Sequence, residues 1–157
     1  MTQATYTYDI NGNRDTLNCI NGNVTTYAYN LANMVTSLQN KNGNNVRSSF
    51  AYTYYLDGNQ RTKTDQTGVT ATYLYDGLGR LTQEAESGIQ GAKTYVYAYD
   101  TRGNRDSLTV SGAESYTVDY SYDLNNRLNS TVKNAGSTAE ATEYRYYPNG
   151  NTISQMT

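Results

Sequence analysis

Tyrosines at alternate positions recur along the chain and dominate its pattern of apolar and polar residues. The clearest example is the segment Tyr73-Leu74-Tyr75-Asp76-Gly77-Leu78-Gly79-Arg80-Leu81. Residues that are two apart project from the same face of an extended strand, so the tyrosine pair predicts a strand with one aromatic face. The Asp-x-x-Gly segment that follows predicts a tight reversal. A second strand is expected to begin at Arg80 and Leu81.

The residues of this reversal predict a defined turn and register. Asp76 suits the first position of a type I turn, because its carboxylate accepts backbone N–H bonds within the turn. Gly79 suits the fourth position, where a left-handed residue completes a G1 bulge. In that geometry Asp76 faces Arg80, and Tyr75 faces Leu81, across the two strands.

Seven copies of this unit cover the chain, at intervals of 21 to 25 residues. Their tyrosine pairs are Tyr6 and Tyr8, Tyr27 and Tyr29, Tyr52 and Tyr54, Tyr73 and Tyr75, Tyr97 and Tyr99, Tyr120 and Tyr122, and Tyr144 and Tyr146. In the second copy Asn33 replaces the glycine, and asparagine also tolerates the left-handed conformation. In the first and fifth copies an extra asparagine separates glycine from arginine, at Asn13-Arg14 and Asn104-Arg105. We expect a turn one residue longer there, with the register left open.

Second turns lie between the copies, for example at Asn21-Gly22 and Thr67-Gly68, so that each repeat reads strand, tight turn, strand, looser turn. Seven repeats predict an all-β fold of about fourteen antiparallel strands. Residues 1–157 are expected to form a single array, which curls or spirals because strongly twisted open sheets rarely exceed about ten strands. Unpaired edge strands recruit other chains, so we expect a segment of a longer array that self-associates through its edges or joins neighbouring repeats.

Composition narrows the functional classes. The net charge of −2 gives no electrostatic case for nucleic-acid binding, and no apolar run is long enough for a membrane helix. The chain has 18 tyrosines, one cysteine and no histidine, so no nucleophile–base pair emerges, and we expect no enzyme and no cofactor. The segment from Asp9 to Asp15 alternates oxygen ligands as a calcium loop does, but it departs from the EF-hand pattern. Turn chemistry explains the same residues, so no metal site is expected.

The segment Tyr75-Asp76-Gly77-Leu78-Gly79-Arg80-Leu81, repeated with variations in all seven units, resembles the YD repeats, also called Rhs repeats. These occur in bacterial secreted and polymorphic toxins, insecticidal toxin complexes, wall-associated proteins and teneurins. The resemblance implies a spiralling β-sheet that forms a hollow shell, which encloses or presents a toxin or effector polypeptide in the toxin members. It also implies a secreted or cell-surface parent protein. The family's cleavage segment has no match here.

The tyrosines admit a second functional interpretation, in which exposed rings bind carbohydrate or protein in cell-surface adhesion. Strict periodicity favours a structural role for the paired tyrosines. The tyrosines outside the pairs are the better candidates for exposed ligand contacts, and these are Tyr55, Tyr95, Tyr116 and Tyr147.

Overall fold

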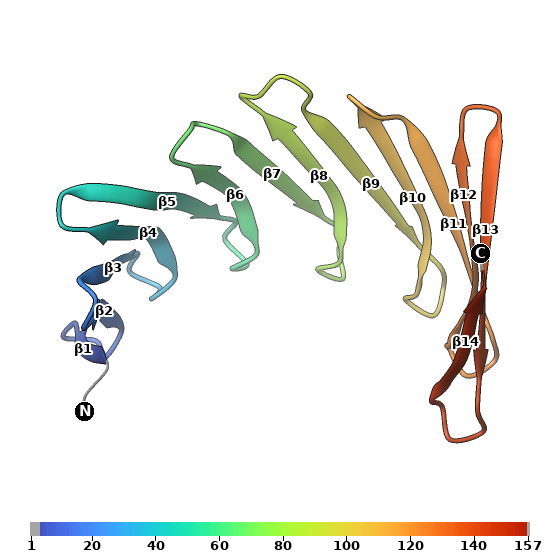
Figure 1. The fold of residues 1–157 in the computed structure, drawn as a ribbon, viewed down its shortest axis with the longest axis horizontal. Coiled ribbons are helices and arrows are strands. Elements are labelled where there is room, and N and C mark those ends of the chain that lie inside the picture. The colour runs from blue at the N-terminus through green and yellow to red at the C-terminus, as the bar shows by residue number, and fades with distance from the viewer. Residues whose placement is uncertain (1–3, 157) are drawn as a thin grey trace. The chain divides into compact units, whose positions relative to one another are not determined.

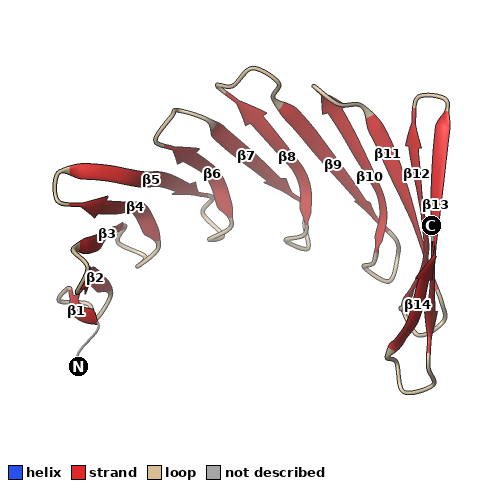
Figure 2. Cartoon of the chain, in the orientation of Figure 1, coloured by secondary structure: helices blue, strands red, loops and turns tan. Residues whose placement is uncertain are grey.

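Alternating tyrosine and small or β-branched residues favour extended strands, and within residues 4–156 each turn between two strands contains glycine or asparagine or directly follows a glycine. The computed structural model describes residues 4–156, which contain strands and turns and no helix (Figure 2). Consequently, no helix able to cross a membrane occurs within that part of the chain. The chain divides into two units, Met1–Tyr73 and Leu74–Thr157, and each is considered on its own.

Fourteen strands run through residues 4–156 (Figure 1). They are β1 (Ala4–Tyr8), β2 (Arg14–Cys19), β3 (Asn23–Tyr29), β4 (Val35–Asn42), β5 (Asn45–Tyr54), β6 (Gln60–Asp65), β7 (Thr70–Tyr75), β8 (Leu81–Ser87), β9 (Lys93–Tyr99), β10 (Arg105–Gly112), β11 (Tyr116–Tyr122), β12 (Leu128–Ala135), β13 (Thr138–Tyr146) and β14 (Thr152–Met156).

Strands that follow one another in the sequence pair antiparallel within each unit. One ladder runs from β1 to β7, of which residues 74 and 75 already belong to the second unit, and the other runs from β8 to β14. This arrangement confirms the predicted all-β fold of antiparallel hairpin repeats. Because each contact joins sequence neighbours, an array of this kind gains length without changing its local structure.

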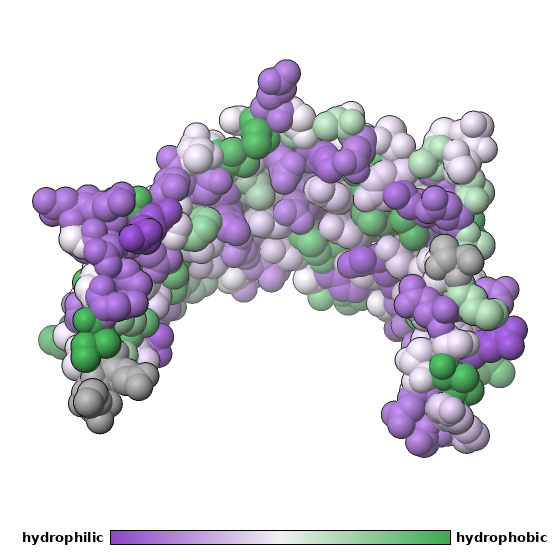
Figure 3. Space-filling model, viewed as in Figure 1, coloured by the Kyte–Doolittle hydropathy of each residue, from purple (hydrophilic) through white to green (hydrophobic). Residues whose placement is uncertain are grey.

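The two faces of each ladder differ in chemistry. The tyrosine face carries the paired tyrosines and the aliphatic residues opposite them, as where Leu17 faces Tyr6 and Leu108 faces Tyr97. The hydroxyl face carries the alternate residues, which are rich in threonine, serine and alanine. Across-strand hydroxyl pairs on this face include Thr7 with Thr16 at 2.7 Å and Ser121 with Ser130 at 2.7 Å. In the view of Figure 3, hydrophilic and hydrophobic residues are interspersed over both units.

A conventional core is nearly absent from this single-layer sheet. Of the described residues only Val110 is buried, at 1% exposure, and it lies on the tyrosine face opposite both Tyr95 and Tyr116. The paired tyrosines are half-buried, apart from Tyr6 and Tyr8 on the outer strand β1. Partial burial of large rings therefore replaces the packed interior of an ordinary domain.

Candidate functional site

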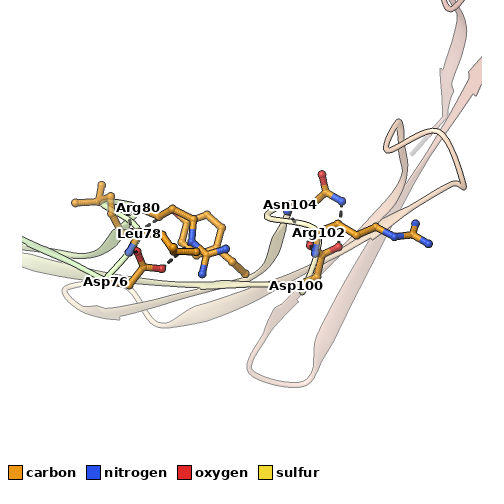
Figure 4. Close-up of polar contacts among 8 residues, drawn as sticks. Asp76, Leu78, Arg80, Asp100, Arg102 and Asn104 are labelled. Atoms are coloured by element: carbon orange, nitrogen blue, oxygen red, sulfur yellow. Dashed lines mark hydrogen bonds and ion pairs between the residues drawn. The ribbon is translucent and has the colours of Figure 1, made fainter.

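The turn after β7 shows how the repeated acidic residue works. Asp76 accepts hydrogen bonds at Oδ1 from the backbone N–H groups of Leu78 and Arg80, both at 2.9 Å (Figure 4). Its Oδ2 accepts the Arg80 Nε–H at 2.7 Å. The backbone N–H of Asp76 donates to the Arg80 carbonyl, and Gly79 has a φ of +74°. The predicted four-residue turn from Asp76 to Gly79, the left-handed glycine and the pairing of Asp76 with Arg80 are confirmed.

The turn of the fifth copy corrects one prediction. Asp100 accepts backbone bonds from Arg102 and Asn104 and a side-chain bond from Asn104 Nδ2 at 3.0 Å (Figure 4). Asn104 thus occupies the place of Arg80, and Asn13 does the same in the first copy. The prediction of a longer turn in these copies is wrong, because asparagine substitutes for arginine as the carboxylate's partner without adding a residue.

The arginine that follows each of these asparagines lies on the tyrosine face, one position later in the repeat than Arg80. Arg105 lies opposite Tyr99, where the sixth copy has Leu128 opposite Tyr122. Its guanidinium carbon Cζ lies 4.7 Å from the centre of the Tyr97 ring, and Arg14 lies at the same distance from Tyr6. A cation over an aromatic face is attracted by the ring quadrupole, so these arginines stabilise the rings that leucine packs against elsewhere.

Asparagines at the turns also connect one repeat to the next. Asn13 Nδ2 donates to Asn33 Oδ1 at 2.8 Å, and Asn104 Nδ2 donates to Asn126 Oδ1 at 3.1 Å. Asn33 and Asn126 are the non-glycine residues with positive φ among the described residues, at +58° and +59°. A bond from the preceding turn therefore offsets the strain of a side chain in the left-handed region. The sequence shows the asparagine substitutions but not this pairing.

Tyrosine hydroxyls form a second set of connections between repeats. The second tyrosine of a pair donates its hydroxyl to the backbone carbonyl of the residue that follows the preceding tyrosine turn. The bonds are Tyr29 to Arg14 at 2.8 Å, Tyr54 to Val35 at 2.6 Å, Tyr99 to Leu81 at 2.7 Å, and Tyr146 to Leu128 at 2.8 Å. Burial raises the pKa of Tyr29 and Tyr54, as expected for hydroxyls held against the sheet. The second tyrosine of a pair thus contributes a hydrogen bond to the preceding repeat as well as its ring.

Where arginine occupies the turn, it reaches the next repeat. Arg80 Cζ lies 4.5 Å from the centre of the Tyr99 ring, and Arg127 Cζ lies 5.0 Å from that of Tyr146. Each arginine therefore binds its own turn carboxylate and covers the ring of the following second tyrosine. One arginine side chain therefore connects the turn of its own repeat to a strand of the next repeat.

Asp65 has the same turn role, although it lies between copies. Its Oδ1 accepts the backbone N–H groups of Thr67 and Val69, at 2.8 and 3.1 Å, and Gly68 has a φ of +87°. The sequence signal was present as Asp-x-x-Gly without preceding tyrosines. The looser second turns of the array thus include one with the geometry of the repeat turn.

Three of the four tyrosines outside the pairs are less exposed than expected. Only Tyr147 is exposed, at 52%, whereas Tyr55, Tyr95 and Tyr116 are half-buried. The hydroxyl of Tyr55 donates to the Tyr73 carbonyl at 3.0 Å, which ties it to the sheet. The lower exposure follows from the alternation of side chains along a strand. Tyr95 and Tyr116 lie on the tyrosine face, where each is opposite Val110. The structure does not bring the four together.

Apolar surface gathers at the turns of the first unit. A pocket of about 540 Å³ lies between the second and third tyrosine turns, lined by Leu31, Met34, Tyr52, Tyr54 and Leu56 among others. Leu31 and Leu56 are fully exposed at the tips of their turns. This is a shallow apolar groove without a titratable group suited to catalysis.

The oxygen-rich segment of the first turn is occupied by turn contacts. Asp9 accepts backbone bonds from Asn11 and Asn13 at Oδ1, and the Asn13 amide at Oδ2. Over residues 4–156 no cluster of three or more metal-ligating side chains occurs. Both Asp9 oxygens therefore serve the backbone reversal.

The turn carboxylates give the fold a defined pH dependence. The Arg80 backbone N–H is the main cause that lowers the pKa of Asp76, and the Asn13 side chain is the main cause for Asp9. A lowered folded-state pKa contributes stability that is present above the unfolded value of about 3.9 and is lost as the pH falls through the folded pKa.

We expect the urea concentration at the unfolding midpoint to decrease as the pH is lowered from about 5 to about 2. The decrease should be smaller in the variant Asp76→Asn, which lacks one of these carboxylates. Asn30 shows that the variant keeps the turn, since its Oδ1 accepts the N–H groups of Ala32 and Met34. Urea titrations of both proteins at pH 7 and pH 2.5 measure the difference. An unchanged midpoint in the unsubstituted chain would contradict the role of the carboxylates.

Two glycines in one turn should respond oppositely to alanine. Gly79→Ala places a side chain at φ +74° and is expected to cost about 1–2 kcal/mol. Gly77 has no positive φ, and a Cβ there meets nothing within 4 Å, so Gly77→Ala should stabilise by about 0.4–1 kcal/mol. Urea denaturation of the two variants provides the test, and equal effects would mean that the backbone conformation is not what selects glycine.

Comparison with known proteins places the fold. No family model matches the chain, and no curated protein sequence matches it. The structure of TcdB2-TccC3-Cdc42 is similar, with a TM-score of 0.64 and 15% identity over 92% of this chain and 10% of that one. TcdB2-TccC3 gives a TM-score of 0.64 and 14% identity over 91% and 10%, respectively. A porin-like protein from Bacteroides uniformis ATCC 8492 gives 0.51 and 19% identity over 82% and 55%.

These identities establish likeness of fold alone. The chain spans about a tenth of the TcdB2-TccC3 chains it matches. A similar fold therefore occurs as a small part of these much longer chains.

Proposed function

We propose that the chain is a structural segment of the β-shell of a YD/Rhs-repeat protein, and that this shell encloses or presents a toxin or effector polypeptide. The parent protein is secreted or lies at the cell surface. The likeness of fold to TcdB2-TccC3 supports this proposal, together with the seven tyrosine–aspartate turns.

The repeated hydroxyl bond between repeats is the observation that carries the proposal. A β-shell built of repeats requires the same contacts between each repeat and the next, and no closed core that would limit the number of repeats. The bonds from Tyr29, Tyr54, Tyr99 and Tyr146 to the preceding repeat do this, alongside the backbone ladder. Since each repeat contacts only its neighbours, stability grows with the number of repeats.

In this proposal the turn aspartates and the paired tyrosines have structural roles and no catalytic role. The turn aspartates are engaged by backbone N–H groups, and the second tyrosines are engaged by carbonyls. Adhesion through exposed tyrosines is not favoured, because three of its four candidate rings are half-buried.

Protease protection of an attached polypeptide tests the enclosure. Tandem proteins with one, two and four copies of the chain would carry the same unfolded reporter with one protease site. If long arrays wrap around their contents, cleavage of the reporter should slow by about tenfold between one and four copies, which corresponds to about 1.4 kcal/mol. Equal cleavage rates in folded tandems of every length would reject enclosure.

A glycan-binding screen on the same proteins examines adhesion separately. Binding that disappears in Tyr147→Ala, with stability unchanged, would move the assignment from wall to adhesion module. We expect no such binding.

A further inference from the structure

The apolar groove between the second and third tyrosine turns lies where the repeat departs from its own pattern. At the turn after β7, Asp76 and Arg80 form an ion pair at 2.7 Å, and the Arg80 guanidinium carbon lies 4.5 Å from the ring centre of Tyr99 in the next repeat. In the sixth copy Asp123 and Arg127 form the same pair, also at 2.7 Å. In both places the side chain that lies over the next repeat's second tyrosine is charged.

In the second copy the same two positions hold uncharged side chains. Asn30 replaces the aspartate and accepts the backbone N–H groups of Ala32 and Met34 at 2.9 and 3.0 Å. Met34 replaces the arginine and closes the turn with its carbonyl, which accepts the Asn30 N–H at 3.0 Å. Its sulfur reaches the third turn, where it lies 3.9 Å from the position that a Cβ on Gly58 would take. The groove is therefore lined by a thioether where other repeats place a guanidinium.

The lining of the groove has no charge, and several of its polar groups are already engaged. None of the ten described residues that line it is acidic or basic. Three of its hydroxyls form hydrogen bonds within the sheet, and these are Tyr54 with the Val35 carbonyl at 2.6 Å, Thr53 with the Thr62 hydroxyl at 2.6 Å, and Tyr55 with the Tyr73 carbonyl at 3.0 Å. A carbohydrate requires hydrogen bonds to its own hydroxyl groups, since unpaired polar groups are costly to bury. The groove therefore suits an apolar group better than a sugar.

Size and exposure indicate a site for one side chain or ring. The volume of about 540 Å³ lies within the range of roughly 300–1,000 Å³ that is usual for small-ligand sites. Leu31 and Leu56 line the groove and are fully exposed at turn positions that polar residues usually occupy. Methionine is flexible and polarizable, so Met34 can adjust to an incoming apolar group. Exposed apolar residues gathered in one place are typical of an interaction site.

We propose that this groove binds an uncharged apolar side chain of a polypeptide segment, such as phenylalanine or leucine, between Leu31 and Leu56 and against Met34. An apolar side chain matches the uncharged lining, whereas a charged one would lose its hydration without gaining a partner. The identity of the polypeptide rests on the proposed function, in which it is the chain that the shell encloses or presents. The replacement of a charged pair by Asn30 and Met34 makes the second and third copies a contact point for that chain.

A peptide titration of the isotope-labelled chain, followed by amide NMR, tests the class of ligand. The probe is a capped peptide of glycine and serine with one central phenylalanine, and the control peptide carries glutamate in its place. We expect saturable shifts at the amides of Ala32, Thr53 and Leu56 with the phenylalanine peptide. The glutamate peptide should bind at least about tenfold more weakly. Shifts that do not saturate at millimolar peptide, or equal binding of the two peptides, would overturn the proposal.

A double variant, Asn30→Asp with Met34→Arg, installs in the groove the charged pair of the turn after β7. The same pair forms a well-bonded turn at Asp76 and Arg80, so the variant is expected to fold, which far-ultraviolet circular dichroism verifies. The phenylalanine peptide should bind it at least about tenfold more weakly, because the guanidinium occupies the groove and places a charge in its lining. Unchanged affinity in the folded variant would contradict the role of the uncharged positions.

Leu56→Ser and Leu78→Ser are a matched pair of substitutions at exposed turn tips, where loss of the fold is not expected. Leu56 borders the groove and is fully exposed, whereas Leu78 is 80% exposed in a turn of the second unit. Leu56→Ser should weaken binding of the phenylalanine peptide by about threefold, since part of its apolar surface is covered in the complex. Leu78→Ser should leave binding unchanged, and equal effects of the two substitutions would place the ligand outside the groove.

Two other occupants would give different results in the same titration. Tighter binding of cellotriose than of the phenylalanine peptide would assign the groove to carbohydrate. Shifts at the same amides on raising the protein concentration alone would assign it to a second copy of the chain, and either result would overturn the proposal. Tandem arrays that protect the reporter without binding the peptide would reject this inference and leave enclosure intact. Arrays that bind the peptide but give no protection would reject enclosure alone.

Discussion

Val110→Asp is expected to lower the free energy of unfolding by about 3 kcal/mol or more, because it places an unpaired charge at a desolvated position. Val110 is 1% exposed, and tyrosines from the strands on both sides lie opposite it. A sheet without other buried aliphatic residues in its described part has no second core to absorb the loss.

Val96→Asp is the matched control, on the strand next to Val110. Val96 lies opposite Thr109 on the hydroxyl face and is 43% exposed. The same change there should cost no more than about 1 kcal/mol, the range of strand propensity. Urea denaturation of both variants at pH 7 decides the issue, and similar midpoints would show that Val110 does not serve as the core of this part of the sheet.

Tyr99→Ala should have the second large effect, a loss of about 3 kcal/mol. The change removes three interactions of one half-buried side chain. These are the packing of the ring, the hydrogen bond from the hydroxyl to the Leu81 carbonyl at 2.7 Å, and the cation–π contact with Arg80, whose Cζ lies 4.5 Å from the centre of the ring. Tyr99→Phe keeps the ring and should cost only about 1 kcal/mol.

Tyr147→Ala provides the comparison for Tyr99, since its ring is half exposed and lies outside the pairs. We expect a change within about 0.5 kcal/mol. These denaturation measurements also separate the two functional interpretations of the tyrosines. A Tyr99→Ala variant of normal stability that lost glycan binding would identify the ring as a sugar platform and contradict its structural role.

The local features of this protein follow from the sequence because each depends on residues a few positions apart. The alternation around Tyr73 and Tyr75 requires a strand with two unlike faces. The spacing from Asp76 to Gly79 requires a carboxylate-capped turn with a left-handed residue. The strand order follows as well, since hairpins joined by short turns must pair in sequence.

The register at the first and fifth turns shows where local reasoning fails. Asn13-Arg14 reads as an inserted residue beside Arg80-Leu81, and only the structure shows that asparagine has taken the arginine's role. The substitution is possible because the carboxylate needs one side-chain donor at that place, and an amide supplies it as a guanidinium does.

Contacts between repeats were decided by the tertiary structure. The bond from Tyr29 to Arg14 spans 15 residues, and that from Tyr54 to Val35 spans 19, because strands β4 and β5 are longer than strands β2 and β3. The pairing of Asn13 with Asn33 and the burial of Tyr95 and Tyr116 depend on the same lateral alignment. The sequence by itself therefore determined each hairpin and its two faces, through short-range sterics and turn hydrogen bonds. The tertiary structure decided which side chains connect one hairpin to the next and which rings remain exposed. Those contacts form only when the pairing of strands brings residues that are distant in the sequence within hydrogen-bonding distance.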